Sequence, residues 1–165
     1  MTILIKNTDL TQRTAINGNV DISNYRHIIK EVQMFVIEPS LGTKLYDKIS
    51  NDYKNNTLSG DYKKLYEDYV VSLICYETAC EFILLHNFTI GNGGIFKQNT
   101  TNGTAVDKEE VDYFANKYRM KANEIQERMN KFLCSVNIAE YNSNQPEKYD
   151  LKPFKRTNNF GGWIL

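Results

Sequence analysis

The fold of this chain is decided by residues 62–83, which read YKKLYEDYVVSLICYETACEFI. Apolar side chains recur there at helical steps, and more of them widen the stripe toward the C-terminal end. The stripe consists of Tyr62, Leu65, Tyr66, Tyr69, Leu73, Tyr76, Cys80 and Ile83, and the residues that widen it are Val70, Ile74, Phe82, Leu84 and Leu85. A helix that is apolar around its circumference is buried, so we expect a central helix from Asp61 to about Asn87.

Helical patterns also stand on both sides of this segment. From Asp21 onward an amphipathic stripe is formed by Ile22, Tyr25, Ile28, Ile29, Val32, Phe35 and Val36. Pro39 places the end of that helix near Glu38 and opens a shorter second helix. From about Asp107 a long fourth helix is predicted by the apolar residues Val111, Phe114, Tyr118, Ala122, Ile125, Met129, Phe132 and Val136.

The remaining segments look irregular. Glycines at 91, 93 and 94 separate two short apolar runs, which is typical of a β-hairpin over about residues 88–97. Residues 1–20 are interpreted as an extended N-terminal arm and residues 140–165 as an extended C-terminal docking tail. The fold class predicted is mainly α: a four-helix bundle-like domain over residues 21–139, with one β-hairpin between helices three and four and extended arms at both ends.

The composition narrows the classes of function. The chain has 165 residues, with 20 basic and 20 acidic residues. Zero net charge argues against a dedicated nucleic-acid or membrane-surface binder. The early charges at Lys6 and Asp9 leave no room for the hydrophobic region of a signal peptide, so we expect a soluble chain that is not exported. The three cysteines have neither metal-ligand spacing nor a disulfide framework.

The residues that could perform chemistry have simpler explanations. His27 and His86 lack a nucleophile or carboxylate at a motif spacing. Glu77 and Glu81 lie one helical turn apart, but the Glu-x-x-His partners of helical metal sites are missing, which favours a solvated or salt-bridged edge. The glycine run at 91–94 lacks the phosphate-loop pattern. We therefore expect no catalytic residue, no cofactor and no metal, and a protein that is not an enzyme.

The C-terminal segment is unusual because it combines helix-breaking residues with large apolar ones. Two interpretations remain open: the tail folds back on its own domain, or it docks on another chain. The 25 residues from 141 to 165 can span up to about 80 Å, and tryptophan is enriched in interface hot spots, so docking on another chain is favoured. The predicted interface residues are Phe154, Lys155, Arg156, Phe160, Trp163, Ile164 and Leu165.

The hairpin leads to a weaker prediction of the same kind. An isolated two-stranded hairpin is only marginally stable in water, so its apolar residues need a partner surface, either the helices of the same chain or a neighbouring subunit. Residues predicted to contact a neighbouring subunit are Phe88, Ile90, Ile95 and Phe96. Peripheral segments around one helical domain are typical of a subunit built for assembly.

The order of these elements resembles the head-to-tail connector, or adaptor, proteins of tailed bacteriophages, most of all the portal-proximal ring proteins of crAss-like phages. The resemblance covers about residues 20–140. It rests on IEPSLGTKLYDKI at 37–49, the aromatic segment at 62–83, FTIGNGGIFK at 88–97 and the long fourth helix.

The resemblance implies a helical subunit repeated in a ring, typically a dodecamer, that joins the portal to the tail and extends the DNA channel. The partners implied are the portal protein, other tail or ring proteins and further copies of this chain, at the head-tail junction of a virion assembled in the bacterial cytoplasm. Double-stranded DNA would pass without sequence-specific binding, and no membrane is involved. Two alternatives remain: a small regulatory binding module encoded by a phage, and a metal-binding helical enzyme.

Overall fold

The structure, a computed structural model, describes residues 2–16, 18–21, 23–86, 88–91, 94–97 and 107–142, with the backbone alone for 88–91 and 94–97. In chain order the elements are α1 (Asn7–Arg13), α2 (Ser23–Val32), the π-helical turn η1 (Gln33–Ile37), α3 (Glu38–Leu41), α4 (Thr43–Asn55), α5 (Gly60–Leu65), the π-helical turn η2 (Tyr66–Val70), α6 (Val71–His86), β1 (Phe88–Gly91), β2 (Gly94–Lys97), α7 (Lys108–Ser135) and α8 (Ala139–Asn142). The protein is mainly helical, as the sequence predicts.

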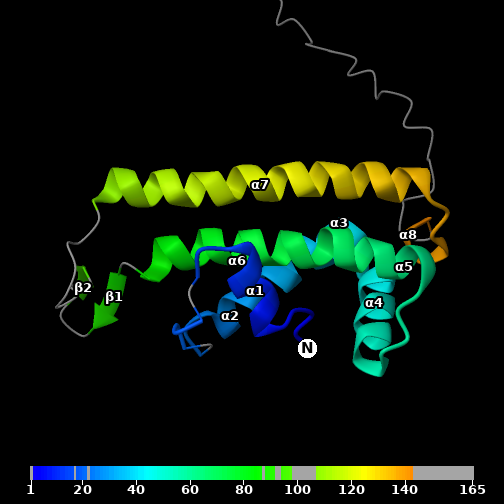
Figure 1. Ribbon diagram of the computed structural model, residues 1–165, viewed down its shortest axis with the longest axis horizontal. Helices are drawn as coiled ribbons and strands as arrows, with labels where there is room; N and C mark the ends of the chain where they lie inside the picture. Colours follow the sequence, from blue (N-terminus) through cyan, green and yellow to red (C-terminus); the bar gives the residue numbers. More distant parts are fainter. Residues whose placement is uncertain are drawn as a thin grey trace, which may run out of the picture.

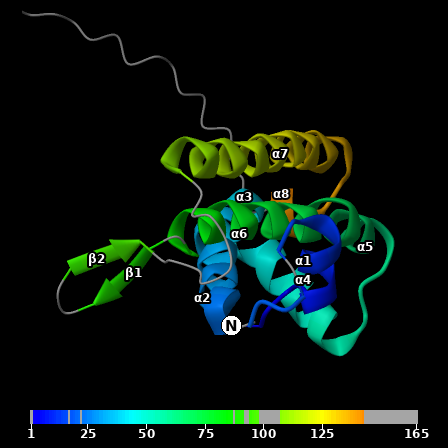
Figure 2. The same cartoon turned by 60° about the vertical axis from the view of Figure 1, so that its left-hand side comes forward.

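One unbroken helical run occupies the centre of the domain. It extends over α5, η2 and α6 from Gly60 to His86, a length of 27 residues. The long helix α7 lies along one side of this run, and α1 and α2 lie on the other (Figure 1, Figure 2). The predicted central helix is therefore confirmed. Its length and composition would also suit a membrane span, but 56% of its most apolar window is buried inside the domain, as in a core helix.

The long helix α7 has a well-defined start. The Asp107 carboxylate accepts a hydrogen bond from the Glu110 N–H at 2.9 Å, and the Glu110 carboxylate accepts one from the Asp107 N–H at 3.3 Å. This capping box satisfies backbone donors that would otherwise lack partners in the first turn. Along α7, the residues buried against the rest of the domain are Val111, Ala115, Tyr118, Ala122, Met129 and Leu133.

The predicted four-helix bundle-like fold class with an extended N-terminal arm is wrong, and residues 140–142 of the predicted C-terminal tail belong to α8. The described residues form eight α-helices and two π-helical turns. Residues 1–20 are not an extended arm, because they contain α1 and bury Leu4, Leu10 and Ile16 in the core. The physical reason is that α6 has apolar side chains on its far side from α7, and the N-terminal residues help to cover them. A helix of seven residues is too short to show a clear period in the sequence.

The predicted β-hairpin is not part of this helical architecture. The segments β1 and β2 pair only with each other, antiparallel, with Ile90 opposite Ile95 and Gly91 opposite Gly94. Two strands of four residues do not form a stable layer by themselves in water. The domain is therefore built from helices, and no sheet contributes to the part of its core that the structure describes.

A buried amide ties the N-terminal residues to the rest of the domain. The Gln33 side chain is fully buried. Its oxygen accepts a hydrogen bond from the Leu4 N–H at 2.9 Å, and its nitrogen donates to the Thr2 carbonyl at 2.8 Å and to the Tyr46 hydroxyl at 3.0 Å. The Tyr66 hydroxyl in turn donates to the Leu4 carbonyl at 2.6 Å. These bonds replace the strand or helix partners that residues 2–4 lack.

Replacing Gln33 with leucine should loosen this attachment. Gln33→Leu keeps the volume but leaves the buried Leu4 N–H without an acceptor, so we expect the free energy of unfolding to fall by about 1–3 kcal/mol. Hydrogen exchange should rise at residues 2–16, and urea unfolding should show the loss of stability. The matched control is Gln126→Leu, since Gln126 is only partly buried and donates to Ser40 at 3.2 Å. Equal losses for both variants would contradict the role of Gln33.

Candidate functional site

A groove opens between α2–η1 and α6. Its apolar lining comes from one segment of the chain, the residues Ile28, Val32, Phe35 and Val36. Three carboxylates complete it: Glu31 from α2, and Glu77 and Glu81 from α6. The cavity volume is about 210 Å³, so the groove can hold one or two large side chains rather than a whole folded partner. It combines apolar surface with negative charge.

The π-helical turn η1 explains why Phe35 belongs to this groove. A regular helix would place Phe35 on the same stripe as Ile28 and Val32, and the sequence predicts it there. The wider turn shifts the register after Gln33, so that Ile37 is buried while Phe35 is 70% exposed. The prediction of a buried Phe35 is therefore wrong. Single π turns inside α-helices occur frequently at functional sites.

The sequence predicts that the helix ends near Glu38 because of Pro39, but the helix does not end there. Pro39 lies in the first turn of α3, directly after η1, and the helical backbone continues to Leu41. A proline ring inside a regular helix clashes with the carbonyl four residues earlier, and the wider turn before Pro39 relieves that crowding. The helix ends at Gly42, whose φ of 79° is a conformation that glycine adopts without strain.

Charged side chains at the groove interact with Arg119 on α7. The Arg119 guanidinium on α7 lies 3.5 Å from the Glu81 carboxylate and donates to the Cys80 sulfur at 3.4 Å. Burial raises the pKa of Glu77 above its usual range, Arg119 opposes that change, and Glu81 adds to it. The groove is lined by three carboxylates and by no basic side chain, and Arg119 beside it pairs with Glu81, so its lining is acidic. The predicted salt-bridged edge at Glu81 is confirmed.

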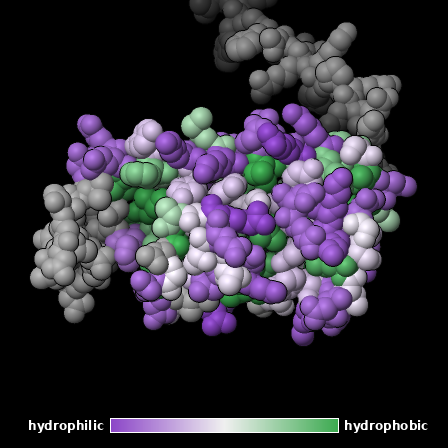
Figure 3. All heavy atoms as spheres, in the orientation of Figure 1, coloured by the Kyte–Doolittle hydropathy of each residue, from purple (hydrophilic) through white to green (hydrophobic). Residues whose placement is uncertain are grey.

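A second exposed apolar surface lies on α7. Tyr113, Phe114 and Met120 are 58%, 52% and 72% exposed. Tyr113 and Met120 are seven residues apart and share one helix face, which points away from the buried Tyr118. Lys117 lies 4.9 Å above the Tyr113 ring. Figure 3 shows hydrophobic patches emerging separately on a face that is otherwise mostly hydrophilic.

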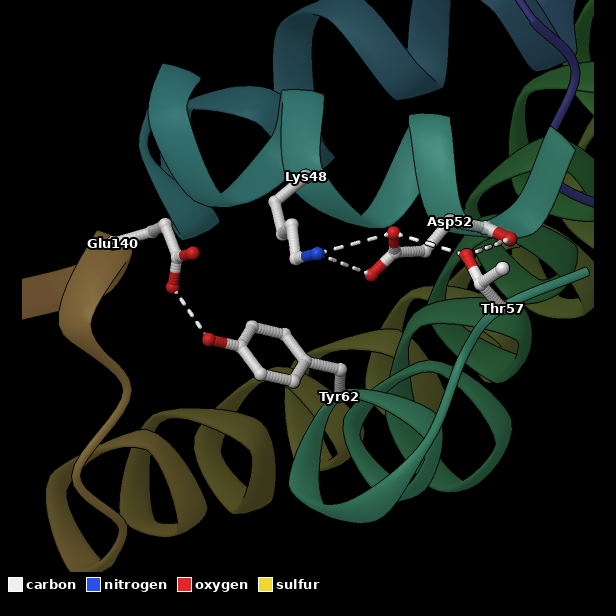
Figure 4. Close-up of polar contacts among 5 residues, drawn as sticks. All are labelled: Lys48, Asp52, Thr57, Tyr62 and Glu140. Atoms are coloured by element: carbon white, nitrogen blue, oxygen red, sulfur yellow. Dashed lines mark hydrogen bonds and ion pairs between the residues drawn. The ribbon is translucent and has the colours of Figure 1, made fainter. Parts of the chain in front are cut away.

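A polar cluster fixes the last described helix (Figure 4). The Tyr62 hydroxyl on α5 donates to the Glu140 carboxylate on α8 at 2.6 Å. Beside it, Lys48 pairs with Asp52 at 3.0 Å, and the Thr57 hydroxyl donates to Asp52 at 3.2 Å. The hydrogen bond to Glu140 is the main cause that raises the pKa of Tyr62 to about 12, and the same bond lowers the pKa of Glu140. The cluster determines where the chain leaves the domain after Asn142.

The predicted interface residues lie outside what the structure describes in side-chain detail. For the hairpin, Phe88, Ile90, Ile95 and Phe96 have a described backbone pairing only. The tail residues Phe154, Lys155, Arg156, Phe160, Trp163, Ile164 and Leu165 fall in residues 143–165, outside the described part of the chain. Of the two histidines, His86 stacks on Phe82 with ring centroids 4.6 Å apart. Among the described residues, no three His, Cys, Asp or Glu side chains could hold a metal together.

Sequence reasoning missed the groove. Two signals for it were present: the acidic pair Glu77 and Glu81 at one-turn spacing, and a proline inside an apolar helical pattern, which indicates a distorted helix. Neither signal reveals that α2 and α6 meet at these residues, since that contact is set by tertiary packing.

The exposure of Phe35 can be tested by introducing charge. Phe35→Glu should change the free energy of unfolding by no more than about 0.5 kcal/mol, as for an exposed position. The matched variant Ile37→Glu, two residues later at a fully buried position, should cost more than about 4 kcal/mol or prevent folding, because it buries an unpaired charge. Urea unfolding followed by circular dichroism measures both. If Phe35→Glu were the more damaging change, the register of η1 would be wrong.

The bond between Tyr62 and Glu140 predicts a dependence on pH. The pKa of Glu140 is lowered from its ordinary 4.5, so its contribution to stability is complete above 4.5 and is lost as the pH falls through the folded pKa. The pKa of Tyr62 is raised from 10.0 to about 12, so its contribution is complete below 10 and is lost between 10 and 12.

In Tyr62→Phe, carboxyl NMR titration should show the pKa of Glu140 moving up toward 4.5, since the bond to the phenol is its main cause. Tyr69→Phe, a change on the same helical run, is the control and should leave that titration unchanged. An unaltered Glu140 titration in Tyr62→Phe would refute the bond.

Comparison with known proteins gives one match. A protein-family model, described as a family of unknown function (DUF6712), matches residues 37–150. The matched range begins within η1, includes Glu77, Glu81 and Arg119, and excludes Glu31 and Phe35. No curated protein and no solved structure matches the chain.

Proposed function

This chain belongs to DUF6712, a family of unknown function. We propose, from the resemblance of its element order to phage connector proteins and from its two exposed apolar surfaces, that it is a structural subunit of a ring that joins the portal of a tailed bacteriophage to the tail. In this role the chain is a head-tail connector that extends the DNA channel. Its action is mechanical and has no catalytic step.

The observation that carries the proposal is the pair of separate apolar surfaces on one tightly packed helical body. Phe35 in the groove and Met120 on α7 are 70% and 72% exposed. Exposed apolar patches on a packed domain are typical of protein contacts. Two unlike surfaces let one subunit contact a neighbour on each side, and such head-to-tail contacts form a closed ring when the rotation between subunits closes.

The charge of the chain is compatible with a channel. With 20 basic and 20 acidic residues the chain is formally neutral. Each phosphate that a basic side chain neutralises adds affinity for DNA, so a neutral wall lets DNA move past without strong or sequence-specific binding. The partners of this proposal are the portal protein, further tail proteins and other copies of the chain, most simply twelve to match the portal, at the head-tail junction of the virion.

The proposal is tested by co-expressing the full chain with the portal protein of the same genome and imaging the complex by electron microscopy. We expect a symmetric ring on the portal, and we expect truncation before Leu151 to abolish it. If the truncated chain still forms the ring, the connector role stands and the docking role of the tail fails. If no complex forms, the connector role fails.

Point variants on α7 refine this test. Tyr113→Glu combined with Met120→Glu should prevent or weaken ring formation, because it places two charges on the proposed apolar contact. The matched control is Glu127→Gln, which lies on the same face one heptad after Met120 and should leave the ring intact. A full ring from the double variant would show that this face of α7 is not a contact.

A further inference from the structure

The groove at Glu31, Phe35, Glu77 and Glu81 has the chemistry of a peptide-binding site. Its apolar wall includes an aromatic ring that is 70% exposed, and three carboxylates line it, of which Glu81 pairs with Arg119. A segment that is complementary to this groove contains large apolar side chains and positive charges, and it contains no acidic side chain. The volume of about 210 Å³ suits one tryptophan-sized group.

One segment of this same chain has that composition. Residues 152–165 read KPFKRTNNFGGWIL and contain three basic side chains, Lys152, Lys155 and Arg156, and no Asp or Glu. They also contain the chain's one tryptophan, Trp163. The segment and the groove are therefore complementary both in charge and in apolar character, which is how opposite patches select each other at an interface.

The groove that lies beside His86 suits this segment less well. It is lined by Ala15, Ile16, Val20, Phe82, Ile83, His86 and Tyr118 and contains no carboxylate. It also lies next to the start of residues 87–106 in the chain. Its lining therefore has no acidic side chain that could pair with Lys155 or Arg156.

The length of the chain allows the segment to reach beyond its own domain. Glu140 is held at Tyr62, and Glu77 follows Tyr62 by fifteen residues, about 22 Å along the helical run. From Asn142 to Trp163 there are 21 residue steps, which span up to about 70–75 Å when extended. The segment can therefore cross to the groove of an adjacent subunit.

We propose that the groove between α2–η1 and α6 binds residues 152–165 of a second copy of this chain, with Trp163 against Phe35 and the basic residues beside Glu31 and Glu77. This inference rests on the proposed function, because it identifies the contact between neighbouring subunits of the ring. The segment of one copy and the groove of the next are unlike surfaces, so the contact is head-to-tail and repeats around the axis. Twelve such weak contacts in a closed ring reinforce one another.

Tryptophan fluorescence of the full chain tests the contact directly, since Trp163 is the only tryptophan. Docking into an apolar groove shifts the emission to shorter wavelength. Over a roughly thousandfold dilution series, the shift should be present at high concentration and disappear on dilution. Phe35→Glu should abolish it, and Met120→Glu, an equally exposed position on α7, should leave it unchanged.

A mixing experiment separates contact between copies from contact within one copy. The Phe35→Glu chain keeps its tryptophan and loses its groove, whereas the Trp163→Ser chain keeps its groove and emits no tryptophan signal. Neither chain alone should show the shifted emission, and mixing them should restore it. If mixing restores nothing while the unaltered chain shows a shift that does not depend on concentration, the segment binds its own domain and the proposal is overturned.

Charge reversal tests the polar half of the contact. Glu31→Lys, at an exposed position, should raise the concentration at the midpoint of the shift about tenfold. Adding Lys155→Glu in the same chain should recover most of that loss. If Glu31→Lys has no effect, or the second change makes binding worse, the segment does not lie along Glu31 and the proposed orientation is wrong.

The outcomes distinguish this inference from the proposed function. If electron microscopy shows the ring on the portal and Phe35→Glu changes neither the ring nor the fluorescence, the groove is not the contact and the connector role stands. If the fluorescence shift passes every test above and no ring forms with the portal, the groove contact stands and the connector role fails.

Discussion

The helical run from Gly60 to His86 is apolar around most of α6, apart from the edge at Glu77 and Glu81, and the rest of the domain is arranged to cover it. The long helix α7 covers one side, and α1 and α2 cover the other (Figure 1, Figure 2). Burying apolar surface stabilises a fold by about 25 cal/mol per Å². A helix that is apolar around most of its circumference therefore needs neighbours around most of it. This requirement explains why the N-terminal residues fold into the core.

Covering an apolar helix with short segments creates a second requirement, because short segments leave backbone groups without partners. Residues 2–4 belong to no helix or strand, and Gln33 and Tyr66 provide partners for the Leu4 N–H and for the Thr2 and Leu4 carbonyls. The buried Gln33 is the first residue of η1, one regular helical turn after the buried Ile29. The same turn therefore supplies the polar group that holds the N-terminus and exposes Phe35 on the opposite side.

The proposed function depends on the exposure of Phe35. Within η1, the exposed Phe35 adds an aromatic ring to a groove that Ile28, Val32 and Val36 also line. This apolar wall lies beside Glu31, Glu77 and Glu81. The chain itself contains a segment with the complementary composition, so the surface and its proposed partner are encoded in one sequence. A subunit of this kind can assemble without a second specialised protein for each contact.

The sequence by itself determined the helical class, the central helix and the long helix α7, because their apolar periodicity is strong and extends over many turns. It also contained both the acidic pair on α6 and the basic, aromatic composition of residues 152–165. It led to a wrong fold class, because α1 is too short for a visible period and a two-stranded hairpin adds no layer to the domain. The exposure of Phe35 and the position of Glu31 on the same groove as Glu77 follow from the tertiary structure alone. Both facts depend on a change of helix register and on contacts between residues far apart in the chain, which local patterns do not encode.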